Sequence, residues 1–172
     1  SSENLKTVTL PKTLTAIGNN AFSGCSGLTS VTVPETVKTI GAYAFSDCSS
    51  IKTAVIKGGA KGIGYHVFSG CKSLAEMTLP FAGFSLEAVN SENSKQEIIN
   101  YFSNGNNDDY YSFNATDGWG RRIPKALKKI TRTGGTRIPD YAFNNFTGVE
   151  TFDIPETITE IGNYAYANCS TT

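Results

Sequence analysis

Apolar residues recur along the chain in a series that repeats every 23 residues. Residues 16–28 read AIGNNAFSGCSGL and residues 39–51 read TIGAYAFSDCSSI, so Ile, Gly, Ala, Phe and Cys return in the same order. Counted from the first aliphatic residue of a unit, the apolar positions are 1, 4, 6, 10, 13, 17, 18 and 21. This spacing matches neither one helix nor one strand, so each unit must contain more than one element.

Each part of a unit predicts a different element. Positions 4 and 6 alternate with polar residues, which is typical of a strand with one buried face, and proline then ends it at position 7. Glycine at position 14 indicates a backbone turn that a side chain would obstruct. The next segment, YAF at 43–45 in the second unit, is long enough for one helical or 3₁₀ turn. The prolines are Pro11, Pro34, Pro80 and Pro155, and the glycines are Gly18, Gly41, Gly64 and Gly162.

The repeat predicts a solenoid, because one unit cannot bury its apolar residues alone whereas stacked units can. We expect one solenoid over residues 1–172, a right-handed stack of short parallel strands with irregular or 3₁₀ outer segments. A small mixed insertion is expected at about 81–122. Neither end shows a polar cap, so we expect a monomeric piece of a longer protein. The units start at Leu5, Leu28, Ile51, Leu74, Leu127 and Val149.

The unit LTSVTVPETVKTIGAYAFSDCSS resembles the BspA-type leucine-rich repeat, in which a strand ends in Pro and is followed by Ile-Gly, Ala-Phe and Cys. Unlike ordinary leucine-rich repeats, position 9 carries Thr13, Thr36, Gly59 or Thr157 in place of Asn or Cys. A Thr hydroxyl there can bond to the backbone of a neighbouring coil. The resemblance implies a leucine-rich-repeat-like fold in a surface or secreted protein of a host-associated microbe, with adhesion or ligand binding and no catalysis.

Three residues depart from the pattern. Lys57 replaces the proline of the third unit, where the segment KGGAKG is expected to loosen the turn. Arg132 occupies the aliphatic position 6 of the fifth unit, so we expect its guanidinium to reach solvent or to pair with an acid. Phe146 stands where Cys is expected and should still fill a buried site.

The insertion interrupts the fourth unit. Ser94 and Glu97 have the spacing of a capping box, which predicts a short helix at about 95–103. YYSF then reads as a strand, DGWG as a turn and RRIP as the return into the stack. Two interpretations of its aromatic residues stay open: either Tyr110, Tyr111 and Trp119 are exposed and bind a sugar or a partner protein, or they anchor the insertion in a core.

Charge and composition exclude several partners. Fifteen basic residues balance fifteen acidic ones, so no overall field attracts nucleic acid or an anionic membrane. No apolar run approaches the roughly 18 residues of a membrane-spanning helix. We therefore expect neither nucleic-acid binding nor membrane insertion of this segment.

The cysteines share position 21 of their units. Four cysteines in a secreted protein would first be interpreted as two disulfides. A cysteine in each coil is explained more simply as a small buried apolar filler, so we expect free thiols and a stability loss of about 1–2 kcal/mol for Cys48→Ala. These residues are Cys25, Cys48, Cys71 and Cys169.

The sequence offers little for catalysis. His66 is the one histidine of the chain and occupies a turn position that we expect to be exposed. Asp108 or Asp109 with Glu76 is the carboxylate pair considered for glycoside chemistry. We expect no enzyme, metal or cofactor, because no triad, zinc or phosphate-binding motif is present.

Positions 3 and 5 of each strand point away from the core and should form two parallel ladders along the stack. Solenoids commonly bind along such faces, although Thr is also simply a good strand former that tolerates water. We expect any pocket where the insertion meets the Glu76 and Lys129 end of the ladders. One ladder is Thr7, Ser30, Thr53, Glu76, Lys129 and Thr151; the other is Thr9, Thr32, Val55, Thr78, Thr131 and Asp153.

The sequence thus predicts an extracellular or cell-surface module that binds a host protein or glycan without catalysis. A passive spacer within a larger surface protein is the alternative. A glycan-active enzyme is a third and weaker hypothesis.

Overall fold

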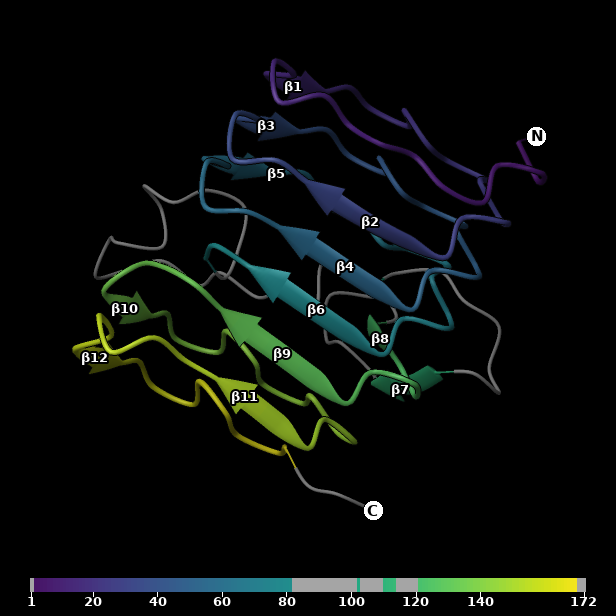
Figure 1. Ribbon diagram of the computed structural model, residues 1–172. Coiled ribbons are helices and arrows are strands. Elements are labelled where there is room, and N and C mark those ends of the chain that lie inside the picture. The colour runs from purple at the N-terminus through teal and green to yellow at the C-terminus, as the bar shows by residue number, and fades with distance from the viewer. Residues whose placement is uncertain (1, 82–101, 103–109, 114–120, 170–172) are drawn as a thin grey trace.

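Strands of two to four residues stack in parallel to form a solenoid, as Figure 1 shows. The computed structural model describes residues 2–81, 102, 110–113 and 121–169. The fold class predicted from the repeat is confirmed.

The main sheet contains five parallel strands in the order β11-β9-β6-β4-β2. The residues at positions 4 and 6 face the core, as Val31 and Val33 do, except in the last coil, where Phe152 is half-buried and Ile154 is exposed. Its strands are β2 (Ser30–Val33), β4 (Thr53–Ile56), β6 (Glu76–Leu79), β9 (Lys129–Arg132) and β11 (Thr151–Asp153).

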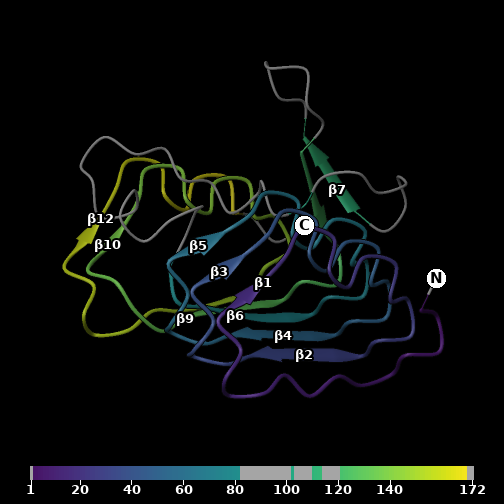
Figure 2. The ribbon, with the colours of Figure 1, turned by 90° about the horizontal axis from the view of Figure 1, so that it is seen from above.

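A second wall is formed by two-residue strands that pair in parallel across the coils from the main sheet (Figure 2). It consists of a three-stranded sheet, β1-β3-β5, and a separate pair, β10-β12. Turns and irregular segments complete each coil, in agreement with the expected irregular or 3₁₀ outer segments, and none of the described residues is in a 3₁₀ helix. These strands are β1 (Ala16–Ile17), β3 (Thr39–Ile40), β5 (Gly62–Ile63), β10 (Arg137–Ile138) and β12 (Glu160–Ile161).

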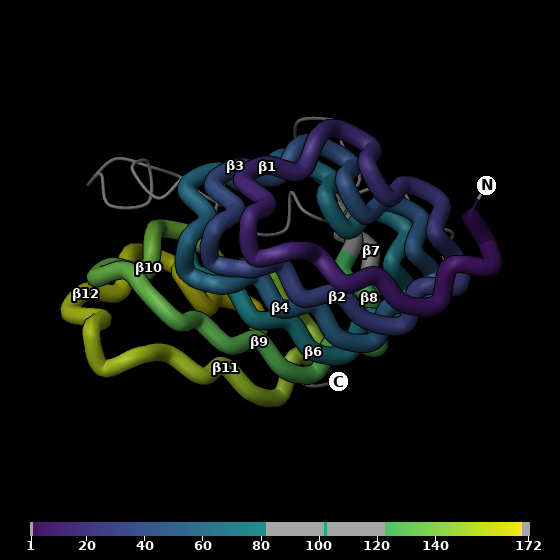
Figure 3. Tube along the Cα trace, turned by 45° about the horizontal axis from the view of Figure 1, so that its top comes forward, coloured from purple at the N-terminus to yellow at the C-terminus, as the bar shows by residue number. Residues whose placement is uncertain are grey.

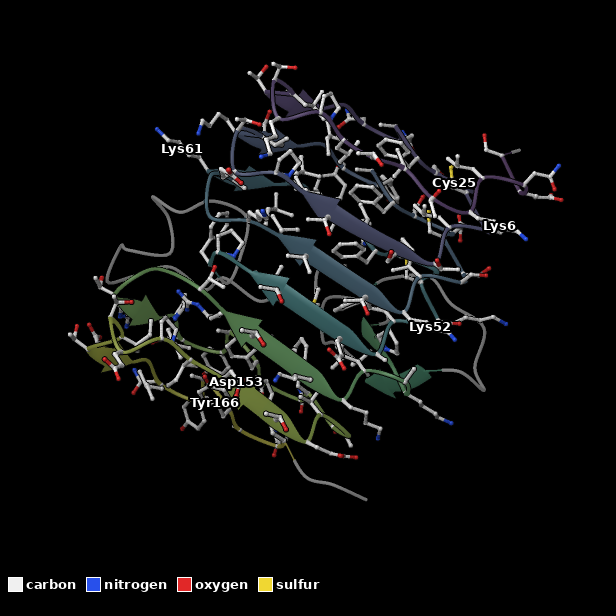
Figure 4. The ribbon with its side chains drawn as sticks, viewed as in Figure 1. Lys6, Cys25, Lys52, Lys61, Asp153 and Tyr166 are labelled. Carbon is white, nitrogen blue, oxygen red and sulfur yellow. The ribbon has the colours of Figure 1, made fainter. Side chains whose placement is uncertain are left out.

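The repeated apolar positions form one continuous core. In the second coil, all eight predicted core positions from Leu28 to Cys48 are buried. Phe45 stacks on Phe22 with ring centroids 5.2 Å apart and on Phe68 at 5.8 Å. The four cysteines are free thiols, as expected, and Phe146 fills its buried site. Figure 4 marks Cys25, which lies at the opposite end of the coils from Lys61.

The glycine at position 14 is required by close stacking of the coils. A Cβ atom added at Gly41 would lie 2.5 Å from the backbone nitrogen of Asn19 in the preceding coil, and Gly64 and Gly162 are similarly confined. At Gly18, in the first coil, an added Cβ meets no atom within 4 Å. The predicted obstruction is thus confirmed wherever a preceding coil is present.

The KGGAKG segment does not loosen its turn. Lys57 donates its backbone N–H to the oxygen of Val33 over 3.1 Å. A Cβ atom added at Gly59 would overlap the backbone of Glu35, so the segment packs directly on the preceding coil. Gly59 takes the place that threonine holds in other units because the two backbones approach closely here.

The position-9 threonines differ from one another. The hydroxyl of Thr157 donates a hydrogen bond to the backbone oxygen of Gly135 in the neighbouring coil over 2.8 Å, as expected. The Oγ1 atom of Thr36 is buried and makes no hydrogen bond within the described structure.

The insertion leaves after β6 and returns before β9. The predicted strand at YYSF is β7 (Tyr110–Phe113), which pairs antiparallel with β8 (Arg121–Pro124). The RRIP segment is therefore half of a hairpin and not only a return into the stack. Phe81, Phe102 and Ile123 are buried and belong to the core cluster. The predicted helix at 95–103 and the DGWG turn lie outside the described residues, apart from Phe102.

Candidate binding surface on the main sheet

The two predicted ladders come into register on the main sheet. Strand pairing places Ser30, Thr53, Glu76, Lys129 and Thr151 side by side in one row. The second row is Thr32, Val55, Thr78, Thr131 and Asp153. All ten side chains are exposed or half-buried, so both rows face outward.

Charged residues lie at the end of these rows nearest the insertion. Lys129 and Asp153 form an ion pair with Nζ and Oδ2 2.7 Å apart. The hydrogen bond and charge of Asp153 raise the pKa of Lys129, and Glu76, its partner on β6, adds to the effect. Figure 4 shows Asp153 on the outward face of β11. This end of the sheet therefore presents an acid, a base and an acid in sequence across three strands.

The first coil departs from the prediction, because residues 5–10 do not form a strand. Thr7 and Thr9 therefore do not extend the ladders by strand pairing. Among the described residues, one backbone hydrogen bond joins this segment to the second coil, from the Thr29 nitrogen to the Lys6 oxygen at 3.3 Å. Within the described residues, the second coil alone contacts this segment along the stack. β2 is consequently the edge of the main sheet.

A groove of about 330 Å³ lies between this first segment and β2. Figure 3 shows the first coil running alongside β2. Its walls contain nearly equal polar and apolar surface, from threonine hydroxyls and the side chains of Val8 and Leu10. The lining residues are Thr7, Val8, Thr9, Leu10, Lys12, Ser30, Thr32, Pro34, Glu35 and Lys57.

Three charged residues border the groove. Lys57 pairs with Glu35 at 3.6 Å, and both side chains are more than half exposed. A backbone hydrogen bond and the charge of Lys57 lower the pKa of Glu35, so its carboxylate is ionised at neutral pH. Lys12 adds a second positive charge, which leaves the rim with one net positive charge.

The groove was not predicted from the sequence. Val8 and Leu10 follow the inward pattern of every other unit, and Lys12 and Glu35 look like ordinary surface residues. The groove arises because residues 5–10 do not pair with β2. No residue pattern in the sequence predicts this missing pairing. The predicted site at the insertion stays a prediction, because Trp119 and the side chains of Tyr110 and Tyr111 lie outside the described residues.

Two arginines are buried: Arg132, which was expected to reach solvent or to pair with an acid, and Arg137, which the sequence did not single out. Arg132 is 2% exposed and does not reach solvent, because its guanidinium donates to the backbone oxygens of Gly134 at 2.8 Å and Arg137 at 3.1 Å. Arg137 pairs with Glu160 of the next coil at 2.7 Å and with Asp140 at 3.1 Å. The two carbonyls let the fifth coil bury the Arg132 guanidinium where the neighbouring β6 buries Leu79, and the two carboxylates hold the Arg137 guanidinium.

Burial shifts the pKa of three groups that could act as nucleophile or base. Burial raises the pKa of the Cys48 thiol to about 12 and that of Cys71 well above its ordinary range. Burial also lowers the pKa of His66, which is half-buried in its turn and not exposed as expected. Asp108 and Asp109 lie outside the described residues.

Neither a metal site nor a membrane span is found in the part of the chain that the structure describes. There, no group of three or more His, Cys, Asp and Glu side chains could hold a metal ion. Within the same residues, no helix is long and apolar enough to cross a bilayer.

Comparison with known proteins agrees with this architecture. The family model of the BspA type leucine rich repeat region matches residues 1–118 and 124–172 in six copies. The chain belongs to the BspA-type leucine-rich repeat family. Membership in this family indicates a repeat protein that serves as a binding or structural module. A search of curated proteins found no match.

Solved bacterial leucine-rich repeat proteins have a similar fold. A protein from Eubacterium ventriosum matches with a TM-score of 0.56 and 21% identity, over 98% of this chain and 37% of that one. A leucine rich cell surface protein from Faecalibacterium prausnitzii matches with a TM-score of 0.45 and 24% identity, over 92% and 38% of the two chains. This BspA-type chain thus spans less than two fifths of the length of either protein.

Proposed function

We propose that the chain is a non-catalytic binding module that uses its main sheet and the groove beside β2 to recognise a protein or glycan partner. The observation that carries the proposal is the groove, because it interrupts a regular surface next to an unpaired sheet edge. It joins the ladders through Ser30 and Thr32. The alignment of the ladders supports an extended contact along the same face.

The edge of β2 favours a polypeptide partner. An open strand edge presents backbone N–H and C=O groups that an extended peptide can pair with. The mixed polar and apolar lining can then accept alternate side chains of that peptide, as strand pairing requires. The positive rim at Lys12 favours an acidic residue on the partner.

We further propose that the module acts at an extracellular or cell surface, as other members of the family imply. Intact cells that make the parent protein should lose this segment on brief protease treatment before cytosolic proteins are cleaved. Retention until lysis would contradict surface display.

A passive spacer is the second candidate. The ladders are rich in Thr and carry no aromatic residue, and interfaces of high affinity usually contain aromatic or arginine anchors. A regular stack can then serve only to hold another domain at a distance.

A binding screen separates the two. The purified chain is immobilised and tested by biolayer interferometry against extracellular-matrix proteins and glycans. For any partner found, Thr32→Arg fills the groove and should weaken binding at least tenfold. The control is Thr39→Arg, which places the same side chain on an exposed residue of β3 on the other wall. Flat responses to all partners, or equal effects of the two variants, would favour the spacer.

A further inference from the structure

Two repeat positions have a left-handed backbone in five of the coils, and these two positions are filled very differently; Gly135 and Gly148 of the fifth coil are left-handed at other positions. The second position has φ between 56° and 76° and carries only Gly, Asp or Asn. The first has φ between 54° and 58° and carries Tyr in three coils. The second set is Gly24, Asp47, Gly70, Asn145 and Asn168; the first is Asn20, Tyr43, His66, Tyr141 and Tyr164.

Backbone preference explains the second position but opposes the first. Gly, Asn and Asp adopt the left-handed region with little strain, whereas a bulky tyrosine there is an outlier. The first coil shows that Asn20 satisfies the same turn. The tyrosines at Tyr43, Tyr141 and Tyr164 are therefore not required by the turn, and such strain is typically retained at functional positions.

In the second and third coils these residues form a compact aromatic row of Tyr43, Tyr65 and His66. Tyr43 stacks on His66 with ring centroids 5.0 Å apart, and Tyr65 meets both rings edge to face at 5.9 Å and 5.3 Å. The row lies in the turns that follow β3 and β5, across the coils from the main sheet (Figure 2). It is thus separate from the groove beside β2.

The aromatic row keeps part of its surface in contact with water. Tyr65 is 53% exposed, and Tyr43 and His66 are half-buried. Burial lowers the pKa of His66, so the imidazole is neutral at pH 7 and the row carries no formal charge there. In the last two coils, Tyr164 stacks on Tyr141 at 5.2 Å, as His66 stacks on Tyr43. Tyr164 is 65% exposed.

We propose that the aromatic row of Tyr43, Tyr65 and His66 binds a carbohydrate, by stacking the C–H face of a pyranose ring on the exposed ring of Tyr65, which stands perpendicular to the other two rings. A neutral, amphipathic row of rings suits a neutral, amphipathic ligand. The three side chains are far too few for a protein interface of roughly 800 Å² on each partner. The exposed amides of Asn19 and Asn20 continue the row into the first coil and supply polar groups for sugar hydroxyls.

The turns also set the shape of the ligand. Tyr43 lies in the second coil and Tyr65 and His66 lie in the third, one spacing of roughly 4.8 Å away, and Asn19 and Asn20 extend this line by one more coil parallel to the stack. A β-1,4-linked oligosaccharide, which presents its rings in a straight ribbon, fits such a row better than a coiled glycan. Cellohexaose and chitohexaose are therefore the probes of choice.

Saturation-transfer difference NMR tests the proposal with these two hexasaccharides. Irradiation of aromatic protein protons should transfer saturation to the ring protons of at least one of them. In the double variant Tyr43→Asn/Tyr65→Ala, each substitution introduces the residue that the preceding coil carries at the same position. This variant should lose at least 80% of the transfer, whereas the control Asp47→Asn, at the second left-handed position, should retain it.

The melting temperature distinguishes binding from a purely structural role. Relief of strain at Tyr43 should leave the melting temperature of the double variant within a few degrees of the original. No transfer to either hexasaccharide, or transfer that persists in the double variant, would overturn the proposal. So would a large fall in melting temperature without any binding by the unmodified chain, since the rings would then only hold the coils together. None of these results bears on the groove beside β2.

Discussion

The Sγ atom of Cys71 lies 3.1 Å from the backbone oxygen of Phe45 and donates a hydrogen bond to it across the boundary between two coils. Cys48 makes the same contact with Phe22 at 3.1 Å. Cys169 does so with Phe143 at 3.0 Å. Interpreting the cysteines as apolar filler captured their packing but not this column of hydrogen bonds between neighbouring coils.

Removing one thiol should weaken the stack. Cys48→Ala leaves a small void and removes the donor to the Phe22 oxygen, so we expect the free energy of unfolding to fall by about 1–2 kcal/mol. Urea denaturation followed by circular dichroism measures the loss. Partner binding at the main sheet should be unchanged. A variant as stable as the original would show that neither the packing nor the hydrogen bond matters.

The same thiol should make stability depend on alkaline pH. Burial raises the pKa of Cys48 from an ordinary value of 9.0 to about 12, so between these values the unfolded thiol releases a proton that the folded one retains. Stability therefore falls as pH rises through this window, by at most about 1.4 kcal/mol per pH unit for one thiol. The stability advantage of the original chain over Cys48→Ala should thus shrink between pH 9 and pH 11. An advantage that stays constant would contradict the shift.

Two glycines at the same repeat position should respond differently to the same change. Gly41→Ala places a Cβ atom 2.5 Å from the Asn19 nitrogen, and we expect a loss of about 1–3 kcal/mol. Gly18→Ala meets no atom within 4 Å, so its effect should stay within about 0.5 kcal/mol. Thermal denaturation of both variants tests this directly. Similar effects would mean that backbone conformation, and not contact between coils, requires glycine here.

The buried arginine of the fifth coil should contribute more than an exposed lysine nearby. Arg137 is 8% exposed and bonds to Glu160 and Asp140, so Arg137→Ala leaves two carboxylates without their partner. Because Glu160 is half exposed, we expect a moderate loss of about 2 kcal/mol. Lys128→Ala removes an exposed pair with Glu150 at 3.5 Å and should cost less than about 0.5 kcal/mol. Equal losses in urea denaturation would refute the distinction.

Repetition explains why much of the fold could be predicted from the sequence. Val31, Val33 and Phe45 recur as apolar residues at fixed positions, so burial in one coil predicts burial in the others, although Ile154 and Ile161 of the last coil are exposed. Gly41 was likewise interpretable, because its position repeats and a repeated glycine indicates a close backbone approach. The register from β2 to β6 follows from the 23-residue period, whereas Glu76 pairs with Lys129 across the insertion and Lys129 pairs with Thr151 at a spacing of 22.

Residues that break the repeat could not be placed in this way. The environment of Arg132 depends on the carbonyls of Gly134 and Arg137, whose approach is set by a coil that is one residue shorter than most. The groove beside β2 depends on pairing that does not occur, although the sequence of the first unit resembles the others. Tyr43 has a left-handed φ of 57°, which a bulky residue rarely adopts. Residue preference therefore could not predict this backbone conformation.

The insertion divides the second wall of the solenoid, and this has a mechanical consequence. Between the described parts of the fourth and fifth coils, backbone hydrogen bonds run only from residues 75–79 to residues 128–133, along β6 and β9 and their ends. Between the second and third coils, by contrast, backbone pairing joins both walls, through β2 and β4 on one and through β3 and β5 on the other. Under tension applied along the stack axis, the backbone hydrogen bonds of the described residues share the load at this boundary in a single row. A chain stretched between two surfaces would therefore part first between β6 and β9, leaving three coils intact on one side and two on the other.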